Sequence, residues 1–172
     1  MGVRFSWRRL WFLIAIIFAI LAVVVVHVVV DWLVREPPNY SQIEDGLWLG
    51  GNVAKPPLGS QAVLNLCEVE DSYTVEVPRW EPIRDAEPVP SLDWLRRQVT
   101  FIESERVAGR VVYVHCQNGA SRSGMVLAAY LMWRKEWTSA QALEFLRSRR
   151  PVVRPNPAFM QLLLDWEQSL KK

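Results

Sequence analysis

The chain has 172 residues, and its 20 basic side chains nearly balance its 18 acidic ones, which leaves a formal net charge of +2. The 138 residues from 35 onward suit one soluble domain with a single core, and their 17 basic and 17 acidic side chains give no indication of nucleic-acid binding. Two cysteines are too few for a structural disulfide framework.

The first element in chain order is a long apolar segment. Residues 10–30 carry no formal charge, and as a helix they cover about 30 Å, the thickness of the hydrocarbon core of a bilayer. No small-residue cleavage site follows at 30–34, so an uncleaved anchor is favoured over a signal peptide. We therefore predict a basic tail over 1–9, a single transmembrane helix over 10–34 and a linker over 35–40.

Beyond the linker, short apolar strands alternate with helices. Strands are predicted near 47–49, 62–66 and 111–114, and helices near 92–105, 123–135, 139–149 and 157–170. Thr138 and Gln141 form a capping box for the third of these helices, and Asn156 with Pro157 starts the last one. The alternation predicts an α/β domain over 41–172 with a central, mostly parallel sheet that is flanked by helices and covered on both faces.

Four arginines gather around the end of the helix near 139–149: Arg147, Arg149, Arg150 and Arg154. They could bind a phosphate-rich surface, but cations also suit a helix C-terminus. We interpret this cluster as a solvated helix end.

The run from His115 to Gly124 carries the chemistry. It joins the strand near 111–114 to the helix near 123–135, so its loop ends at a helix N-terminus, where free N–H groups and the helix dipole favour an anion. The slim residues in the middle of the loop let these amides approach a ligand. We predict a phosphate-binding loop made of Gln117, Asn118, Gly119, Ala120, Ser121 and Arg122.

Side chains of this run can also carry a reaction. The planar guanidinium of Arg122 binds two phosphate oxygens at once. The positive field of the loop lowers the pKa of Cys116 and keeps it as a nucleophilic thiolate. Ser123 can donate a hydrogen bond to this sulfur, and His115 is expected to bond to neighbouring backbone and shape the loop. The pattern predicts a phosphatase that uses a phosphocysteine intermediate, with no metal or other cofactor.

The motif from His115 to Ser123 resembles the active-site motif of the protein tyrosine phosphatase superfamily, and most closely that of its small dual-specificity branch. The resemblance implies the cysteine-phosphatase fold and covers about residues 40–170. Further segments resemble the opening strand, the next core strand and the lead-in to the last helix of that branch: 43–50, 62–66 and 150–162.

The resemblance also implies a general acid on a loop ahead of the cysteine. Asp85 lies thirty-one residues before Cys116, and the segment 83–85 meets the family pattern of an apolar residue, any residue and then aspartate. Such an acid protonates the departing oxygen and later takes a proton from the attacking water. Glu87 is the alternative acid.

A second implication of the resemblance concerns Cys67, which ends the segment 65–67. Some lipid-directed members of the superfamily carry a similar Asn-Leu-Cys, whose cysteine traps the oxidised nucleophile. The resemblance thus implies a reversible disulfide between Cys67 and Cys116, and the alternative is that Cys67 is a buried packing residue.

The substrate is expected to be a phosphorylated protein or a phosphorylated lipid. The uncharged loop favours phosphotyrosine, phosphoserine or phosphothreonine, because lipid-directed relatives tend to carry basic residues there. Attachment to a membrane through 10–34 favours a phosphoinositide or phosphatidylglycerophosphate instead. A sulfur-transfer domain and an inactive phosphate-binding adaptor are further alternatives, although neither needs an acid such as Asp85. The sequence predicts no oligomeric state.

The side of the membrane that carries the catalytic domain stays open. Arg4, Arg8 and Arg9 precede the span, whereas Arg35 alone closely follows it, so the positive-inside bias exports the C-terminal domain. A reactive cysteine survives better in a reducing compartment, which favours the opposite orientation.

Overall fold

The structure is a computed structural model that describes residues 7–34 and 38–171; within 7–34, side chains are described for Trp11, Ile14 and 16–30. Two compact units, Met1–Pro37 and Pro38–Lys172, make up the chain. Most of the predicted basic tail and residues 35–37 of the predicted linker lie outside the described residues.

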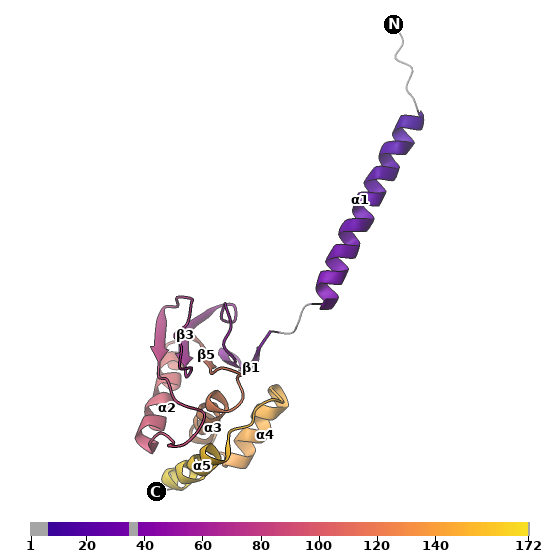
Figure 1. The fold of residues 1–172 in the computed structure, drawn as a ribbon. Helices are drawn as coiled ribbons and strands as arrows, with labels where there is room; N and C mark the ends of the chain where they lie inside the picture. The colour runs from indigo at the N-terminus through magenta and orange to yellow at the C-terminus, as the bar shows by residue number, and fades with distance from the viewer. Residues whose placement is uncertain (1–6, 35–37, 172) are drawn as a thin grey trace. The chain divides into compact units, whose positions relative to one another are not determined.

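The first unit contains helix α1, Trp7–Val34 (Figure 1). The helix predicted over 10–34 is therefore present, and it begins three residues earlier. Its apolar side chains over 16–30 are exposed, for example Phe18 at 69 % and Val28 at 62 %. Among the residues that the structure describes, however, no helix combines the length and the apolar character that crossing a bilayer requires, so the predicted transmembrane span is not found.

The second unit is built on a five-stranded sheet with the order β1-β2-β5-β3-β4. Its strands are β1 Tyr40–Glu44, β2 Leu47–Gly50, β3 Ser60–Asn65, β4 Val77–Trp80 and β5 Val111–His115. β1 and β2 pair antiparallel around Gly46, whose positive φ of 68° suits glycine, and the other neighbours pair parallel. The mostly parallel sheet is as predicted, whereas the two edge strands, β1 and β4, were not predicted.

Four helices of this unit begin and end close to the predicted residues: α2 Leu92–Val107, α3 Arg122–Lys135, α4 Ser139–Arg149 and α5 Pro157–Leu170. The capping box is confirmed, since the Gln141 N–H donates to Thr138 Oγ1 at 3.3 Å and the Thr138 N–H donates to Gln141 Oε1 at 2.9 Å. Asn156 caps α5 by accepting from the Phe159 N–H at 2.9 Å.

The helices α2 to α5 gather against one face of the sheet (Figure 1). Alternate strand residues such as Leu49, Leu64 and Val114 point to this face and form one core with them. The opposite face is contacted by loop residues, with Asp71 beside the His115 ring. The expectation that both faces are covered is met by loops on this side, because the connections after β2 and β3 form no helix.

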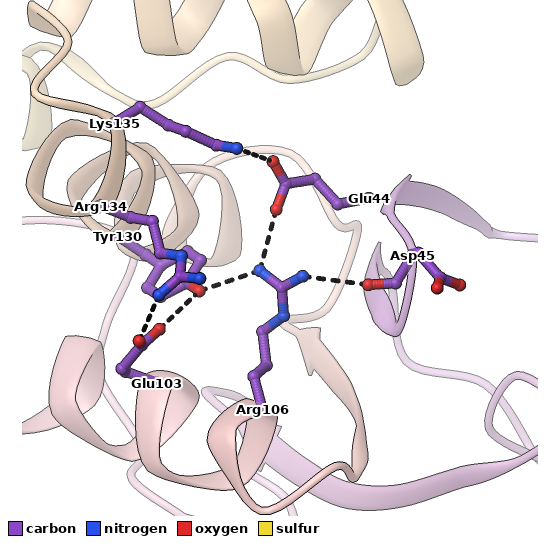
Figure 2. A network of polar contacts seen from close by, with 7 residues as sticks. All are labelled: Glu44, Asp45, Glu103, Arg106, Tyr130, Arg134 and Lys135. Carbon is purple, nitrogen blue, oxygen red and sulfur yellow. Dashed lines mark hydrogen bonds and ion pairs between the residues drawn. The ribbon is translucent and has the colours of Figure 1, made fainter.

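A polar network holds the C-terminal end of α3 (Figure 2). Arg106 of α2 donates to Glu44 Oε2 at 2.8 Å and to the Tyr130 hydroxyl of α3 at 2.9 Å. Burial opposes the ionisation of Glu44, but hydrogen bonds from Lys135 and Arg106 outweigh it and lower the pKa of this carboxyl. The network thus joins α2, α3 and the turn between β1 and β2.

Candidate active site

The predicted phosphate-binding loop lies between the end of β5 and the first turn of α3. Ser121 occupies the N-cap position of α3, yet its side chain makes no cap hydrogen bond. Its hydroxyl instead donates to Asp85 Oδ1 at 2.6 Å and accepts from the Asn156 N–H at 3.1 Å. The first amides of α3 are therefore left for an anion.

Donors outside the loop hold four consecutive carbonyl groups, those of Gln117, Asn118, Gly119 and Ala120. The backbone N–H of Asn52 bonds the first at 3.0 Å, and the backbone N–H of Arg154 bonds the last at 3.0 Å. The side chain of Arg150 bonds the two between them, at 3.0 and 2.8 Å. Because a trans peptide directs its N–H opposite to its carbonyl, these bonds turn the N–H groups of the loop inward.

Arg150 corrects the interpretation of the arginine cluster as a solvated helix end. Its side chain is buried, with 6 % of the residue exposed, because it passes behind the loop to reach the carbonyls. The contact also explains Gly119, which has a positive φ of 66°; a Cβ there would collide with the backbone of Gly50 and lie 2.6 Å from the guanidinium. Only glycine fits this position.

Cys116 is 2 % exposed, and its sulfur lies 3.2 Å from Ser123 Oγ. Burial by itself would raise the pKa of this thiol. Hydrogen bonds from the hydroxyl and N–H of Ser123 and from the N–H of Ala120, together with the charge of Arg122, outweigh burial and lower the pKa of Cys116. The direction of the shift agrees with the thiolate that the sequence predicts.

Arg122 is held by one of its nitrogens and leaves another free. Nη1 donates to the carbonyls of Ile83 and Leu66, at 3.1 and 3.3 Å. Nε is buried and has no hydrogen-bond partner among the residues that the structure describes. A buried donor without a partner costs free energy unless a ligand accepts from it, so this nitrogen fits a phosphate oxygen.

Asp85 lies in the irregular segment between β4 and α2, where it reaches the loop. Its Oδ1 accepts from Ser121 and, at 2.8 Å, from Asn156 Nδ2. Glu87 is exposed, and its carboxylate has no hydrogen bond within the described part of the chain. Of the two predicted acids, the structure brings Asp85 to the loop.

His115 makes contacts other than those expected. Its Nε2 lies 3.2 Å from the Asp71 carboxylate, its Nδ1 lies 3.7 Å from Cys67 Sγ, and its ring stacks on Tyr113. The expected side-chain bond to backbone is absent from the described residues, because the ring points to the loop-covered face of the sheet. His115 therefore connects the loop to Cys67 and Asp71.

Both cysteines are free thiols, and both are buried. Burial raises the pKa of Cys67 to about 11, with smaller contributions from Cys116 and Asp71 in the same direction. Cys67 follows β3 and Cys116 follows β5, which are neighbouring parallel strands paired up to Asn65 and His115. The two predicted redox partners therefore lie at the carboxyl ends of two adjacent strands.

Beside the loop is an open cavity of about 680 Å³, lined by Asp85, Ser121, Arg154, Asn156, Met160 and Leu164, among others. Its position next to the loop suits the part of a substrate that surrounds the phosphate. Within the described residues, no group of three or more His, Cys, Asp or Glu side chains is placed to hold a metal ion.

Most of the residues that support the loop could not be recognised as its supports from the sequence. Asn52 and Arg154 act through backbone N–H groups, which leave no side-chain signal. Asn156 was recognised only as a helix cap, although it also bonds Asp85. Arg150 belongs to a cluster of arginines whose sequence pattern also fits a helix end exposed to solvent.

Comparison with known proteins agrees with this geometry. The family described as "Dual specificity phosphatase, catalytic domain" matches residues 58–169. The chain is 36 % identical over 139 residues to Dual specificity protein phosphatase 1 of Arabidopsis thaliana, and the match covers 76 % of this chain and 70 % of that protein. It is 37 % identical over 90 residues to Dual specificity protein phosphatase 16 of Homo sapiens, and this match covers 52 % of this chain and 14 % of that protein.

Several vertebrate relatives are thus much longer than this chain, which spans 24 % or less of their length. In structure, the chain is similar to human DUSP28, with a TM-score of 0.73 and 27 % identity over 80 % of this chain and 99 % of that one. The fold is also that of PTPMT1 in complex with PI(5)P, at a TM-score of 0.68 and 23 % identity over 77 % of this chain and 97 % of that one. The family match extends well beyond the cysteine loop, from β3 to α5, and the chain belongs to the dual-specificity phosphatase family.

Proposed function

We propose that the chain is a cysteine-dependent phosphomonoesterase that acts through a phosphocysteine intermediate. The observation that carries this proposal is the convergence of three features on one loop. These are a buried thiol with a lowered pKa, inward-facing amides, and a buried guanidinium nitrogen that has no hydrogen-bond partner among the described residues. Together they provide a nucleophile and a site for the three non-bridging oxygens of a phosphate.

In the first step, the thiolate of Cys116 attacks phosphorus, and the bond from phosphorus to the ester oxygen breaks. Asp85 gives its proton to the departing oxygen, which leaves as a hydroxyl group. Oδ1 of Asp85 is occupied by Ser121 and Asn156, whereas Oδ2 has no bond within the described part of the chain, so Oδ2 is the oxygen placed to face substrate. This arrangement supports Asp85 rather than Glu87 as the acid.

In the second step, Asp85 takes a proton from a water molecule that attacks the phosphocysteine, and the bond from sulfur to phosphorus breaks. The electron pair returns to sulfur, where the hydroxyl of Ser123, 3.2 Å away, stabilises the re-formed thiolate. Inorganic phosphate then leaves, and the enzyme returns to its starting state.

We propose phosphorylated proteins as the substrates. The support is that Gln117 and Asn118, the exposed side chains of the loop, carry no charge, and that the relatives described above are named protein phosphatases. The alternative substrate is a phosphoinositide, because the chain shares its fold with PTPMT1, whose structure was solved in complex with PI(5)P. Comparing phosphopeptides with phosphoinositides and phosphatidylglycerophosphate in mixed micelles decides between these classes.

The test of the proposal is hydrolysis of p-nitrophenyl phosphate by the full-length chain in a non-ionic detergent with a metal chelator. We expect turnover that vanadate inhibits and that Cys116→Ser abolishes. Asp85→Asn should lower turnover on the order of 100-fold, as loss of a general acid does. Asp93→Asn is the matched control, because this exposed aspartate lies on α2 and has no hydrogen bond to the loop. Undiminished turnover in Cys116→Ser would refute the mechanism.

We further propose that α1 attaches the chain to a membrane. The support is its continuous exposed apolar surface over 16–30, which water solvates poorly. The full-length chain should float with vesicles after a high-salt wash, and replacing Ile20 and Val24 by lysine should weaken this binding. Protease protection in sealed vesicles then reports the side that carries the catalytic unit. Recovery of the unaltered chain away from the vesicles would contradict the proposal.

A further inference from the structure

The side chain of Arg150 joins the phosphate-binding loop to the start of the catalytic unit. Its Nε donates to the carbonyl of Gly119 at 2.8 Å. Its Nη2 donates to the carbonyl of Asn118 at 3.0 Å and to the side-chain oxygen of Asn39 at 2.6 Å. Asn39 and Arg150 are 111 positions apart in the chain, so one guanidinium bonds two loop peptides and an amide from the other end of the domain.

Asn39 provides the acceptor that ties Arg150 to a part of the domain outside the loop. Arg150 is buried, and within the described residues no carboxylate pairs with it; its other acceptors are the two loop carbonyls. A buried cation needs such hydrogen bonds to offset the loss of its hydration. A guanidinium that bonded only the loop would move with it, whereas the bond to Asn39 fixes it.

Asn39 is itself held where β2 ends. Its backbone carbonyl accepts from the N–H of Gly51 at 2.8 Å. A Cβ on Gly51 would collide with the side-chain amide of Asn39, so the absence of a side chain at Gly51 permits this approach. Gly51 follows the strand that pairs with β5, which ends just before Cys116. The amide of Asn39 is therefore anchored to the same sheet as the nucleophile.

We propose that Asn39 is a positioning residue of the active site, which acts through Arg150 to keep the loop amides directed at the bound phosphate. The inference rests on the proposed phosphatase function. Without the Asn39 oxygen, the Arg150 side chain loses one of its three acceptors, and among the described residues this is its one acceptor outside the loop. The peptides at Asn118 and Gly119 then lose their fixed orientation. The same amides stabilise the thiolate and the phosphate, so both are weakened together.

The test uses the full-length chain in detergent with the variants Asn39→Ala and Asn39→Asp. Gln42→Ala is the matched control, because this exposed amide lies on the neighbouring strand β1 and has no hydrogen bond to the loop. The rate of inactivation by iodoacetate as a function of pH titrates the thiol without turnover. Vanadate inhibition measures binding of a phosphate-like anion, and kcat/KM on p-nitrophenyl phosphate measures catalysis.

For Asn39→Ala we expect the midpoint of thiol titration to move to higher pH, with vanadate affinity and kcat/KM each about 10-fold lower, the size expected for one charge-assisted hydrogen bond acting indirectly. Asn39→Asp keeps an oxygen that can accept from Arg150, so this variant should retain most of the vanadate affinity and kcat/KM of the unaltered chain. Gln42→Ala should behave like the unaltered chain. Tryptophan fluorescence checks that each variant is folded.

Two results would overturn the inference while leaving the phosphatase function intact. One is an Asn39→Ala variant with the titration midpoint and vanadate affinity of the unaltered chain. The other is an equal loss in Asn39→Ala and Asn39→Asp, because the oxygen would then not be the group that matters. An unaltered chain that neither binds vanadate nor turns over substrate would instead refute the proposed function, and the inference with it.

Discussion

Replacing Ser123 by alanine should raise the pKa of Cys116 by about one to two units. The hydroxyl of Ser123 lies 3.2 Å from the sulfur, within the range of a hydrogen bond to a thiolate. A hydrogen bond to a charged group contributes about 1.5–3 kcal/mol, and one pKa unit corresponds to about 1.4 kcal/mol. The N–H groups of Ser123 and Ala120 and the charge of Arg122 remain, so a thiolate still forms, but at higher pH.

The assay is alkylation of the full-length chain by iodoacetate over a range of pH. Because the thiolate is the reactive form, Ser123→Ala should react more slowly below its raised midpoint and as fast as the unaltered chain well above it. Ser121→Ala is the matched control, since its hydroxyl bonds Asp85 and Asn156 rather than the sulfur, and its midpoint should not move. An unchanged midpoint in Ser123→Ala would refute the reasoning.

Glu87→Gln should keep turnover on p-nitrophenyl phosphate within about two-fold of the unaltered chain, because this side chain does not reach the loop; a loss on the order of 100-fold would identify it as the acid. Mild peroxide should yield a disulfide between Cys67 and Cys116 in peptide mass spectra, and it should form faster as pH rises toward the raised pKa of about 11 for Cys67. Irreversible sulfonic acid at Cys116 without the disulfide would contradict this. Glu44→Gln should lower the free energy of unfolding by about 1–2 kcal/mol at neutral pH, since this half-buried carboxylate bonds two cations. The pKa of Glu44 is lowered by folding, so its contribution is full above the unfolded value of about 4.3 and is lost as pH falls through the folded value. Urea unfolding curves of the variant and the unaltered chain should therefore converge in acid, and a constant difference would contradict the assignment.

The sequence could predict the reacting groups because they lie close together in one motif. Cys116 and Ser123 flank a loop whose strand and helix are each indicated by local residue pattern. Helix boundaries were also predictable, because caps such as Asn156 act over three or four residues. These features depend on short segments, which is where sequence patterns carry the most information.

The support of the loop could not be predicted in the same way. Asn39 and Arg150 meet only when the first strand and the segment after α4 are packed together. An arginine side chain that follows a helix can either extend into solvent or be buried. Which of the two occurs depends on distant hydrogen-bond acceptors, and no local sequence pattern reveals them. The edge strand β4 was missed because Val77–Trp80 includes a proline and an arginine and lacks a run of apolar residues.

Because the loop carbonyls turn outward and its backbone N–H groups turn inward, the loop binds an anion through its backbone, whatever side chains it carries. The peptides that surround the phosphate are oriented by donors on other elements, while the side chains of Gln117 and Asn118 point to solvent. Substitutions at these two positions can alter which substrates are accepted while the peptide scaffold is preserved. Gly119 has no such freedom, because both its backbone conformation and its neighbours exclude a side chain. The loop thus divides into positions at which selectivity can evolve and one at which it cannot.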